Sequence, residues 1–176
     1  MFEISKRTTV LQTPWFALRA KTIGDGGETY YAVEGPDYVC VLALTDERQI
    51  VLVRQFRPAV EEFTLELPSG LVDDGEKPQL TAARELNEET GYRVRSLELM
   101  GELRPDTGRL ENRLWCFFAR VERERDEPRI ESGELGLQTL TMPLDEFLAT
   151  CGREGGCIHA LNLAPVALAL LQGRLK

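Results

Sequence analysis

The sequence is poor in the residues that most often build metal and disulfide sites. Its 176 residues include four cysteines and a single histidine, His159. The cysteines, Cys40, Cys116, Cys151 and Cys157, form no Cys-x-x-Cys pair, which argues against a zinc site. Because the N-terminal residues do not resemble a signal peptide, we expect reduced thiols and a cytoplasmic location.

Long apolar runs, repeats and an excess of positive charge are also missing. No apolar stretch approaches the roughly 20 residues of a membrane span, so no membrane partner is expected. Acidic residues outnumber basic ones by 29 to 21, which argues against nonspecific binding of nucleic acid because that binding depends on lysine and arginine. No internal repeat or low-complexity linker divides the chain. We therefore expect one domain over residues 1–176.

Hydrophobic patterning predicts strands, a helix, more strands and then helices. Residues 14–22 and 29–34 flank the turn Gly-Asp-Gly-Gly and predict a hairpin within an N-terminal region of residues 1–37. Asn162 is expected to cap the last helix. Further strands are predicted at 38–45, 49–57, 94–103, 113–121 and 134–142, and helices at 80–90, 144–151 and 162–175. This order predicts an α+β fold with a mixed sheet between helices.

Three carboxylates project from one face of the helix predicted at 80–90. Glu85 and Glu89 are four residues apart, and Glu88 lies three residues after Glu85. Like charges at this spacing repel by roughly 0.2–0.5 kcal/mol per pair unless a cation lies between them. Such oxygen ligands suit Mg²⁺, which takes one or two carboxylates together with substrate phosphates. The alternative for three glutamates alone is a solvated acidic helix face.

The spacing around these glutamates resembles the Nudix box, Gly-x5-Glu-x7-Arg-Glu-U-x-Glu-Glu-x-Gly-U, in which U is a bulky apolar residue. Residues 70–92 match every fixed position, and only Tyr92 departs from the aliphatic residue usual at the last position. The matching residues are Gly70, Glu76, Arg84, Glu85, Glu88, Glu89 and Gly91. The resemblance implies an αβα sandwich around a mixed sheet. It also implies metal-dependent hydrolysis of a nucleoside diphosphate linked to another moiety, with water as the nucleophile.

Three of the matching residues are expected to support the box structurally. Arg84 is expected to hydrogen-bond Glu76 or to orient one of the glutamates, and Gly91 to end the helix as a left-handed cap. The resemblance assigns Glu85 and Glu89 to metal binding, with Glu88 as a further ligand that also joins the catalytic set.

The residues before the box resemble those of ADP-ribose pyrophosphatases and nucleotide-sugar hydrolases, which read V-x-Q-x-R-x-P and then E-L-P-A-G. Residues 51–76 read VLVRQFRPAVEEFTLELPSGLVDDGE. In that branch the residue before the box glycine, here Ser69, offers its backbone carbonyl to a metal, and Gly70 belongs to the substrate site.

Two arginines and a glutamate of this segment are further candidates. Arg54 and Arg57 match arginine positions that can pair with a diphosphate, the alternative being surface arginines at a strand end. Glu66 lies in an otherwise apolar strand, where an unpaired carboxylate would be costly. It either joins the metal network or holds an arginine.

The catalytic base in this branch comes from a loop after the box. Glu134, immediately before the strand predicted at 134–142, is our first choice, and Glu131 is the second. The alternative for either glutamate is a plain surface position.

The resemblance also implies the substrate and the assembly. It predicts Mg²⁺, or Mn²⁺, a nucleoside diphosphate sugar such as ADP-ribose, and a homodimer built through the N-terminal region. ADP-ribose pyrophosphatases commonly carry a Ser-Pro-Gly turn past the box, whereas residues 106–108 read Asp-Thr-Gly, so the nucleobase and the sugar stay open. The rivals are a hydrolase of dinucleoside polyphosphates or nucleoside triphosphates, and a Nudix module that binds a nucleotide sugar without cleaving it.

Overall fold

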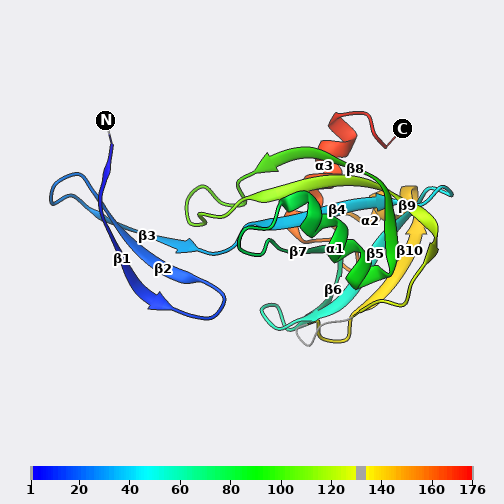
Figure 1. The fold of residues 1–176 in the computed structure, drawn as a ribbon, viewed down its shortest axis with the longest axis horizontal. Coiled ribbons are helices and arrows are strands. Elements are labelled where there is room, and N and C mark those ends of the chain that lie inside the picture. The colour runs from blue at the N-terminus through cyan, green and yellow to red at the C-terminus, as the bar shows by residue number, and fades with distance from the viewer. Residues whose placement is uncertain (1, 130–133, 176) are drawn as a thin grey trace.

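A computed structural model describes residues 2–129 and 134–175, and in it a narrow arm projects from a wider body (Figure 1). The arm is an antiparallel sheet of three strands, β1 (Ile4–Gln12), β2 (Ala17–Ile23) and β3 (Thr29–Glu34). The predicted N-terminal hairpin is therefore incomplete, because β1 pairs with the outer edge of β2. Nearly every side chain of β1 is exposed, so that strand lacks the hydrophobic alternation that would reveal it.

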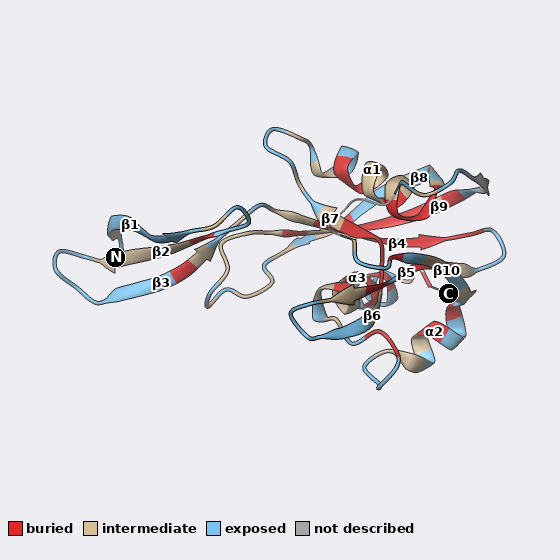
Figure 2. Cartoon of the chain, turned by 90° about the horizontal axis from the view of Figure 1, so that it is seen from below, coloured by how far each residue is buried: buried red, intermediate tan, exposed pale blue. Residues whose placement is uncertain are grey.

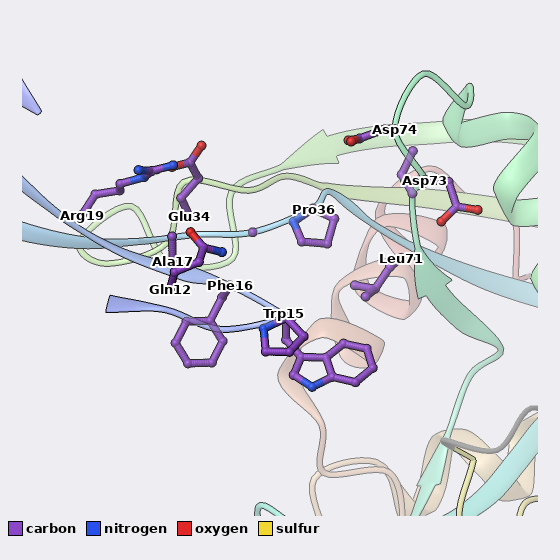
Figure 3. A pocket seen from close by; sticks show the side chains of 13 residues that line it. Gln12, Trp15, Phe16, Ala17, Arg19, Glu34, Pro36, Leu71, Asp73 and Asp74 are labelled. Atoms are coloured by element: carbon purple, nitrogen blue, oxygen red, sulfur yellow. The ribbon is translucent and has the colours of Figure 1, made fainter. Parts of the chain in front are cut away.

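The first predicted strand also begins later than expected. Residues 13–16 form a turn in which the Thr13 hydroxyl accepts hydrogen bonds from the backbone N–H groups of Trp15 (3.1 Å) and Phe16 (2.9 Å). A threonine side chain in this position competes with strand pairing. The turn presents Trp15 at the end of the arm that faces the body (Figure 3).

The body is built on one mixed sheet in the order β10-β5-β4-β9-β8, with two short strands, β6 and β7, paired to β5 and β4. Strands β4 and β9 run parallel, and the other pairs are antiparallel. The strands are β4 (Tyr38–Leu44), β5 (Gln49–Arg57), β6 (Glu62–Glu66), β7 (Ser69–Leu71), β8 (Tyr92–Leu103), β9 (Leu114–Arg125) and β10 (Gln138–Pro143).

Helices cover both faces of this sheet. Figure 2 shows α1 (Pro78–Thr90) on one side, and α2 (Leu144–Thr150) and α3 (Ala160–Leu171) on the other. Alternate residues of β4 serve the two cores, since Val41 packs in the cluster that contains Leu86 of α1 while Leu42 packs in the cluster with Phe147 of α2. The predicted αβα sandwich around a mixed sheet is confirmed. Among the described residues, no helix is long and apolar enough to cross a membrane.

One helix boundary follows its local sequence signal, and another is changed by a tertiary contact. Helix α1 ends as predicted at Gly91, whose φ of 74° is left-handed and whose N–H donates to the Asn87 carbonyl (2.7 Å). Helix α3 begins two residues earlier than predicted, so Asn162 is not its cap. Asn162 is fully buried inside the helix, where its side-chain oxygen accepts the Leu67 N–H. The Asn162 side chain, which the sequence predicted as a helix cap, instead satisfies the buried N–H group of Leu67.

The sheet splits where the candidate site lies. Strands β4 and β5 are paired only at Leu44 and Ile50, close to their connecting turn, and then diverge. The chain between β6 and β7 crosses the gap, and the Pro68 carbonyl accepts the Val41 N–H (2.9 Å). The split therefore brings residues 66–70 into the middle of the sheet, under the carboxylates of α1.

Candidate active site

Arg84 supplies a cation to the crowded carboxylates of α1. Its guanidinium donates hydrogen bonds to Glu85 (2.9 Å), Glu88 (3.0 Å) and Glu76 (3.1 Å). The hydrogen bond to Glu76, opposed by partial burial, raises the pKa of Arg84, and the same bond holds the pKa of Glu76 below its usual range. One arginine thus ties the loop before α1 to two glutamates on its surface.

Glu89 is the most deeply placed carboxylate of the helix, with only 2% of its surface exposed. Its Oε2 accepts the backbone N–H of Ser69 (2.9 Å). Burial raises the pKa of Glu89 well above its usual value, the Ser69 N–H opposes that rise, and the charges of Glu134 and Glu85 add to it. A cation bound beside Glu89 would relieve this repulsion.

Gly70 permits a close approach between the backbone and a carboxylate. A Cβ atom placed on Gly70 would lie 2.1 Å from Cδ of Glu85, much closer than real Cβ contacts. The box therefore needs glycine here because the Glu85 side chain lies directly against the backbone of β7.

These groups meet in one cavity of about 340 Å³. Its walls include the predicted residues Ser69, Gly70, Glu85, Glu89, Arg57, Arg84 and Glu134, together with Trp15, Tyr38 and Gln55. Glu134 lies four residues before the start of β10, which begins at Gln138 and not at residue 134 as predicted. The structure thus brings the first-choice base into the same cavity as Ser69, Glu85 and Glu89, three of the four predicted metal ligands.

Three other candidates lie elsewhere. Arg54 stacks over the Phe63 ring, with its guanidinium carbon 4.1 Å from the ring centre, and lines a different cavity. Glu88 bonds Arg84 and does not line the cavity. Glu131 lies outside the described residues.

Glu66 holds an arginine, which is one of the two roles left open by the sequence. Nε of Arg57 donates to Oε1 of Glu66 (2.8 Å), Nη2 donates to Oε2 (2.6 Å), and the Thr64 hydroxyl donates to Oε1 (2.5 Å). Burial raises the pKa of Glu66, and the bonds from Arg57 and Thr64 outweigh it, so the net pKa is below its usual range. This fork fixes Arg57 at the cavity wall.

The donor set fits a hard divalent cation that is shared with a substrate. Among residues 2–129 and 134–175, no three His, Cys, Asp or Glu side chains form a closed metal cage. Magnesium sites that bind phosphates do not require one, since one or two carboxylates and substrate oxygens complete the coordination. Glu85, Glu89 and the Ser69 carbonyl are the residues that would hold it, and the deep burial of the Glu89 carboxyl group beside Glu85 and Glu134 supports that assignment.

On its arm side, this cavity borders a second one of about 550 Å³, which we call the arm cavity (Figure 3). Trp15 and Leu71 line both, and Phe16 and Pro36 line only the arm cavity. Trp15 is 72% exposed, which leaves its ring accessible to a ligand.

The turn at 106–108, which departs from the Ser-Pro-Gly pattern, lies at the base of the arm. The Tyr30 hydroxyl donates to the Gly108 carbonyl, and Lys21 pairs with Glu111 (2.9 Å). Thr107 lines a separate cavity with these residues and not the one that contains the carboxylates.

Two residues of the site were not identified from the sequence. Tyr38 shares a hydrogen bond with the Ser69 hydroxyl (2.8 Å), and burial raises its pKa. Gln55 is a polar residue in the apolar strand predicted at 49–57, and the structure leaves only 2% of its surface exposed. The signal available in the sequence for Gln55 was a polar residue within an apolar strand, since such residues are seldom buried without a role. Nothing in the sequence singles out Tyr38.

The fold and the site define an αβα protein in which one helix presents carboxylates to a phosphate-sized cavity. Residues 36–156 match the NUDIX domain. The chain is 32% identical over 169 residues to a Mycobacterium tuberculosis protein named ADP-ribose pyrophosphatase, an alignment that covers 94% of this chain and 81% of that protein. It is 34% identical over 116 residues to a Bacillus subtilis protein of the same name, covering 66% of this chain and 63% of the relative.

A solved structure described as an ADP compounds hydrolase shares the fold, with a TM-score of 0.79 at 20% identity. The match covers 98% of this chain and 95% of that structure. The chain belongs to the NUDIX family. It spans 63% of the length of the Bacillus subtilis relative.

Proposed function

We propose that this chain is a divalent-metal-dependent hydrolase that cleaves the diphosphate of ADP-ribose or a related nucleoside diphosphate sugar. The products are a nucleoside monophosphate and a sugar phosphate. The observation that carries the proposal is the single cavity in which Glu85, Glu89 and Ser69 face Arg57 and Glu134. The names of the Mycobacterium tuberculosis and Bacillus subtilis relatives support ADP-ribose as the substrate.

The residues divide the reaction among them. The Glu134 carboxylate takes a proton from the attacking water as the water oxygen bonds to phosphorus, and the bond from phosphorus to the bridging oxygen breaks. The part of the Arg57 guanidinium not bound by Glu66 pairs with a phosphate oxygen. Glu88 acts through Arg84 as a positioning residue, since Arg84 bonds both Glu88 and Glu85.

We place Mg²⁺ at Glu85, Glu89 and the Ser69 carbonyl, with Mn²⁺ able to replace it. A divalent cation supplies charge neutralisation at the phosphate oxygens in the transition state. An all-oxygen donor set favours these two metals over softer ones.

The arm contributes to assembly and to nucleobase binding in this proposal. Its exposed apolar side chains include Val10, Leu11, Trp15 and Tyr31. Covering such a surface with a second copy would bury area that the single chain leaves in water, which favours a homodimer built through residues 1–37. Trp15, at the junction of the two cavities, is placed to stack on a nucleobase.

Product analysis tests the proposed reaction. ADP-ribose, GDP-mannose, UDP-glucose and a diadenosine polyphosphate, each with Mg²⁺ or Mn²⁺, are incubated with the enzyme and separated by chromatography. We expect AMP and ribose phosphate from ADP-ribose at the highest kcat/KM. Binding of ADP-ribose without turnover of any compound would instead support the non-catalytic module.

Variants then assign the base. Glu134→Gln is expected to lower kcat by roughly 10²–10⁴-fold because a positioned general base contributes about that much. Glu146→Gln, on the exposed surface of α2, is the matched control and should leave kcat unchanged. A loss confined to Glu131→Gln would move the role to that residue.

The dimer is tested separately. Leu11→Glu, which places a charge on the exposed apolar surface of the arm, should shift the sedimentation coefficient from that of a dimer to that of a monomer. A wild-type protein that sediments as a monomer at every concentration would refute this part of the proposal.

A further inference from the structure

A third cavity, of about 490 Å³, adjoins the active site beside β6 and the start of α3. We call it the His159 cavity. It shares Tyr38 and Arg57 with the active site, just as the arm cavity shares Trp15 and Leu71 with it. The three cavities therefore form a row with the carboxylates in the middle one. A substrate with a diphosphate in the middle has two end groups, and the row offers one cavity for each.

The environment of His159 fixes which nitrogen of its ring carries a proton. Asn162 Oδ1 accepts the Leu67 N–H, so the amide nitrogen of Asn162 is the atom that faces Nδ1 of His159, at 2.9 Å. An amide nitrogen only donates, which makes Nδ1 the acceptor. Burial lowers the pKa of His159, and Glu66 partly opposes this effect. The ring is thus a neutral imidazole with its proton on Nε2.

That Nε2–H is an unused donor on the cavity wall. Within the described chain, the only partners of the His159 ring are Asn162 and, at 3.9 Å, Glu66, and both approach Nδ1. The other polar groups nearby are already satisfied, because Glu66 binds Arg57 and Thr64. Glu62 also lines the cavity, and its carboxylate forms no hydrogen bond or ion pair with the described residues.

The chemistry of these walls matches a sugar. A free donor at His159 and a free acceptor at Glu62 complement hydroxyl groups, since each hydroxyl both accepts and donates. The apolar side chains Val60, Ile158 and Leu161 also line this cavity and suit the C–H face of a sugar ring. A cavity of this size has room for a sugar and its bound water.

We propose that the His159 cavity binds the sugar on the phosphate remote from the nucleoside, and that His159 determines specificity by donating from Nε2–H to a sugar hydroxyl. This inference rests on the proposed function and names the substrate group that one part of the site recognises. His159 does not touch the reacting atoms, so its effect falls on the KM of substrates that carry the sugar.

The test compares two substrates that differ only at that end. ADP-ribose carries the distal sugar, whereas the methyl ester of ADP has a methyl group in its place. His159→Leu should raise the KM for ADP-ribose about three- to tenfold, the effect of one lost hydrogen bond. Its kcat for ADP-ribose and its kinetics with methyl-ADP should stay those of the wild type. An equal change with both substrates, or a change with neither, would overturn the proposal.

Two features keep the result interpretable. The substitution removes the acceptor of the Asn162 amide, but His159 makes no side-chain capping bond to α3 and Asn162 Oδ1 still accepts the Leu67 N–H, so a disturbed helix would change the kinetics of both substrates. Trp15→Leu is the matched variant at the other end of the row. It should raise the KM for both substrates by the same factor, since both carry the same nucleoside. A sugar-dependent loss in Trp15→Leu, with none in His159→Leu, would reverse the assignment of the two ends.

Calorimetric binding separates this inference from the proposed reaction. If the wild type cleaves neither compound, the proposed function fails, but titration of ADP-ribose and methyl-ADP into wild type and His159→Leu still tests the cavity. We expect the variant to weaken binding of ADP-ribose alone. Equal affinities of the two proteins for ADP-ribose would refute the role of His159.

Discussion

The arm and the body use strands of similar length in opposite ways. Along β4 six of seven residues are buried, whereas along β1 all but Ile4 are exposed. The body has a helix layer on each face of its sheet, and the arm has none within the described residues. The body thus has what it needs to be stable alone, while the arm presents apolar side chains that a partner or a ligand would cover. The difference teaches that the carboxylates sit on the part of the chain with its own core, whereas the proposed association falls to the part without one.

The largest expected effect is a loss of kcat from a substitution in the body that leaves the arm unchanged. Glu89→Gln removes a charged metal ligand but keeps an oxygen that can accept the Ser69 N–H. We expect kcat to fall on the order of 10³-fold or more, because a metal contributes several kcal/mol to the transition state. The free energy of unfolding should stay the same or rise, since a deeply buried carboxyl group is replaced by a neutral amide of the same shape. Steady-state kinetics and urea unfolding check both; undiminished kcat would refute the metal assignment.

The next effect sharpens the contrast in stability. Leu42→Ala opens a cavity in the core of the body and should lower the free energy of unfolding by about 2–5 kcal/mol. Leu11→Ala, at a residue of the arm that is 53% exposed, should change it by less than about 0.5 kcal/mol in the monomer. Urea unfolding at several protein concentrations measures both. A loss with Leu11→Ala that appears only at high concentration would show that a second copy covers the arm.

A smaller effect is expected from Gly70→Ala. The added Cβ would meet Cδ of Glu85 at 2.1 Å, so the carboxylate must move away from the backbone. Misplacing a metal ligand in this way should cost about 10–100-fold in metal affinity or kcat. Activity as a function of Mg²⁺ concentration is the measurement. Wild-type metal dependence would show that Glu85 does not need its position against β7.

The smallest effect concerns pH and contrasts two ion pairs. The pKa of Glu66 is below its usual value of 4.5 in the folded protein, so its contribution to stability is complete above that pH and is lost as pH falls through the lowered pKa. The stability difference between wild type and Glu66→Gln should therefore shrink below pH 4.5. Denaturant unfolding between neutral and acidic pH measures it, with Glu34→Gln, at the exposed partner of Arg19, as the control. A difference that is constant over that range would contradict the assignment.

Much of the body could be predicted from the sequence, as could the hairpin of β2 and β3 in the arm, but β1 could not. Strands β4 and β5 are continuous apolar runs, and α1 has a proline at its start and Gly91 at its end, so local patterns identified them. The exposed strand β1 has no such pattern because its outward side chains pack against nothing in the chain. Sequence patterning reports burial within the chain, and a strand whose side chains stay exposed leaves little trace of it.

The same distinction applies within the site. The carboxylates of α1 were predictable because the box fixes their spacing on one helix, and Ser69 and Gly70 follow from it. Arg54 and Arg57 could have been told apart, since residues three apart in a strand point to opposite faces. Arg57 reaches the cavity, and Arg54 points to Phe63. The role proposed for His159 was not predictable, because it depends on contacts with Asn162 and Glu66 that only the folded chain creates.

The split in the sheet has a kinetic consequence. The contact between Ser69 and Glu89, which builds the part of the site with the α1 carboxylates, joins residues 20 apart in the chain, whereas the contact between Leu67 and Asn162 joins residues 95 apart. Closing the longer loop costs on the order of 1 kcal/mol more in chain entropy. We therefore expect the end of the site with the His159 cavity to form last during folding. Pulse-labelling hydrogen exchange should show the Ser69 amide protected before the Leu67 amide, and the reverse order would refute this.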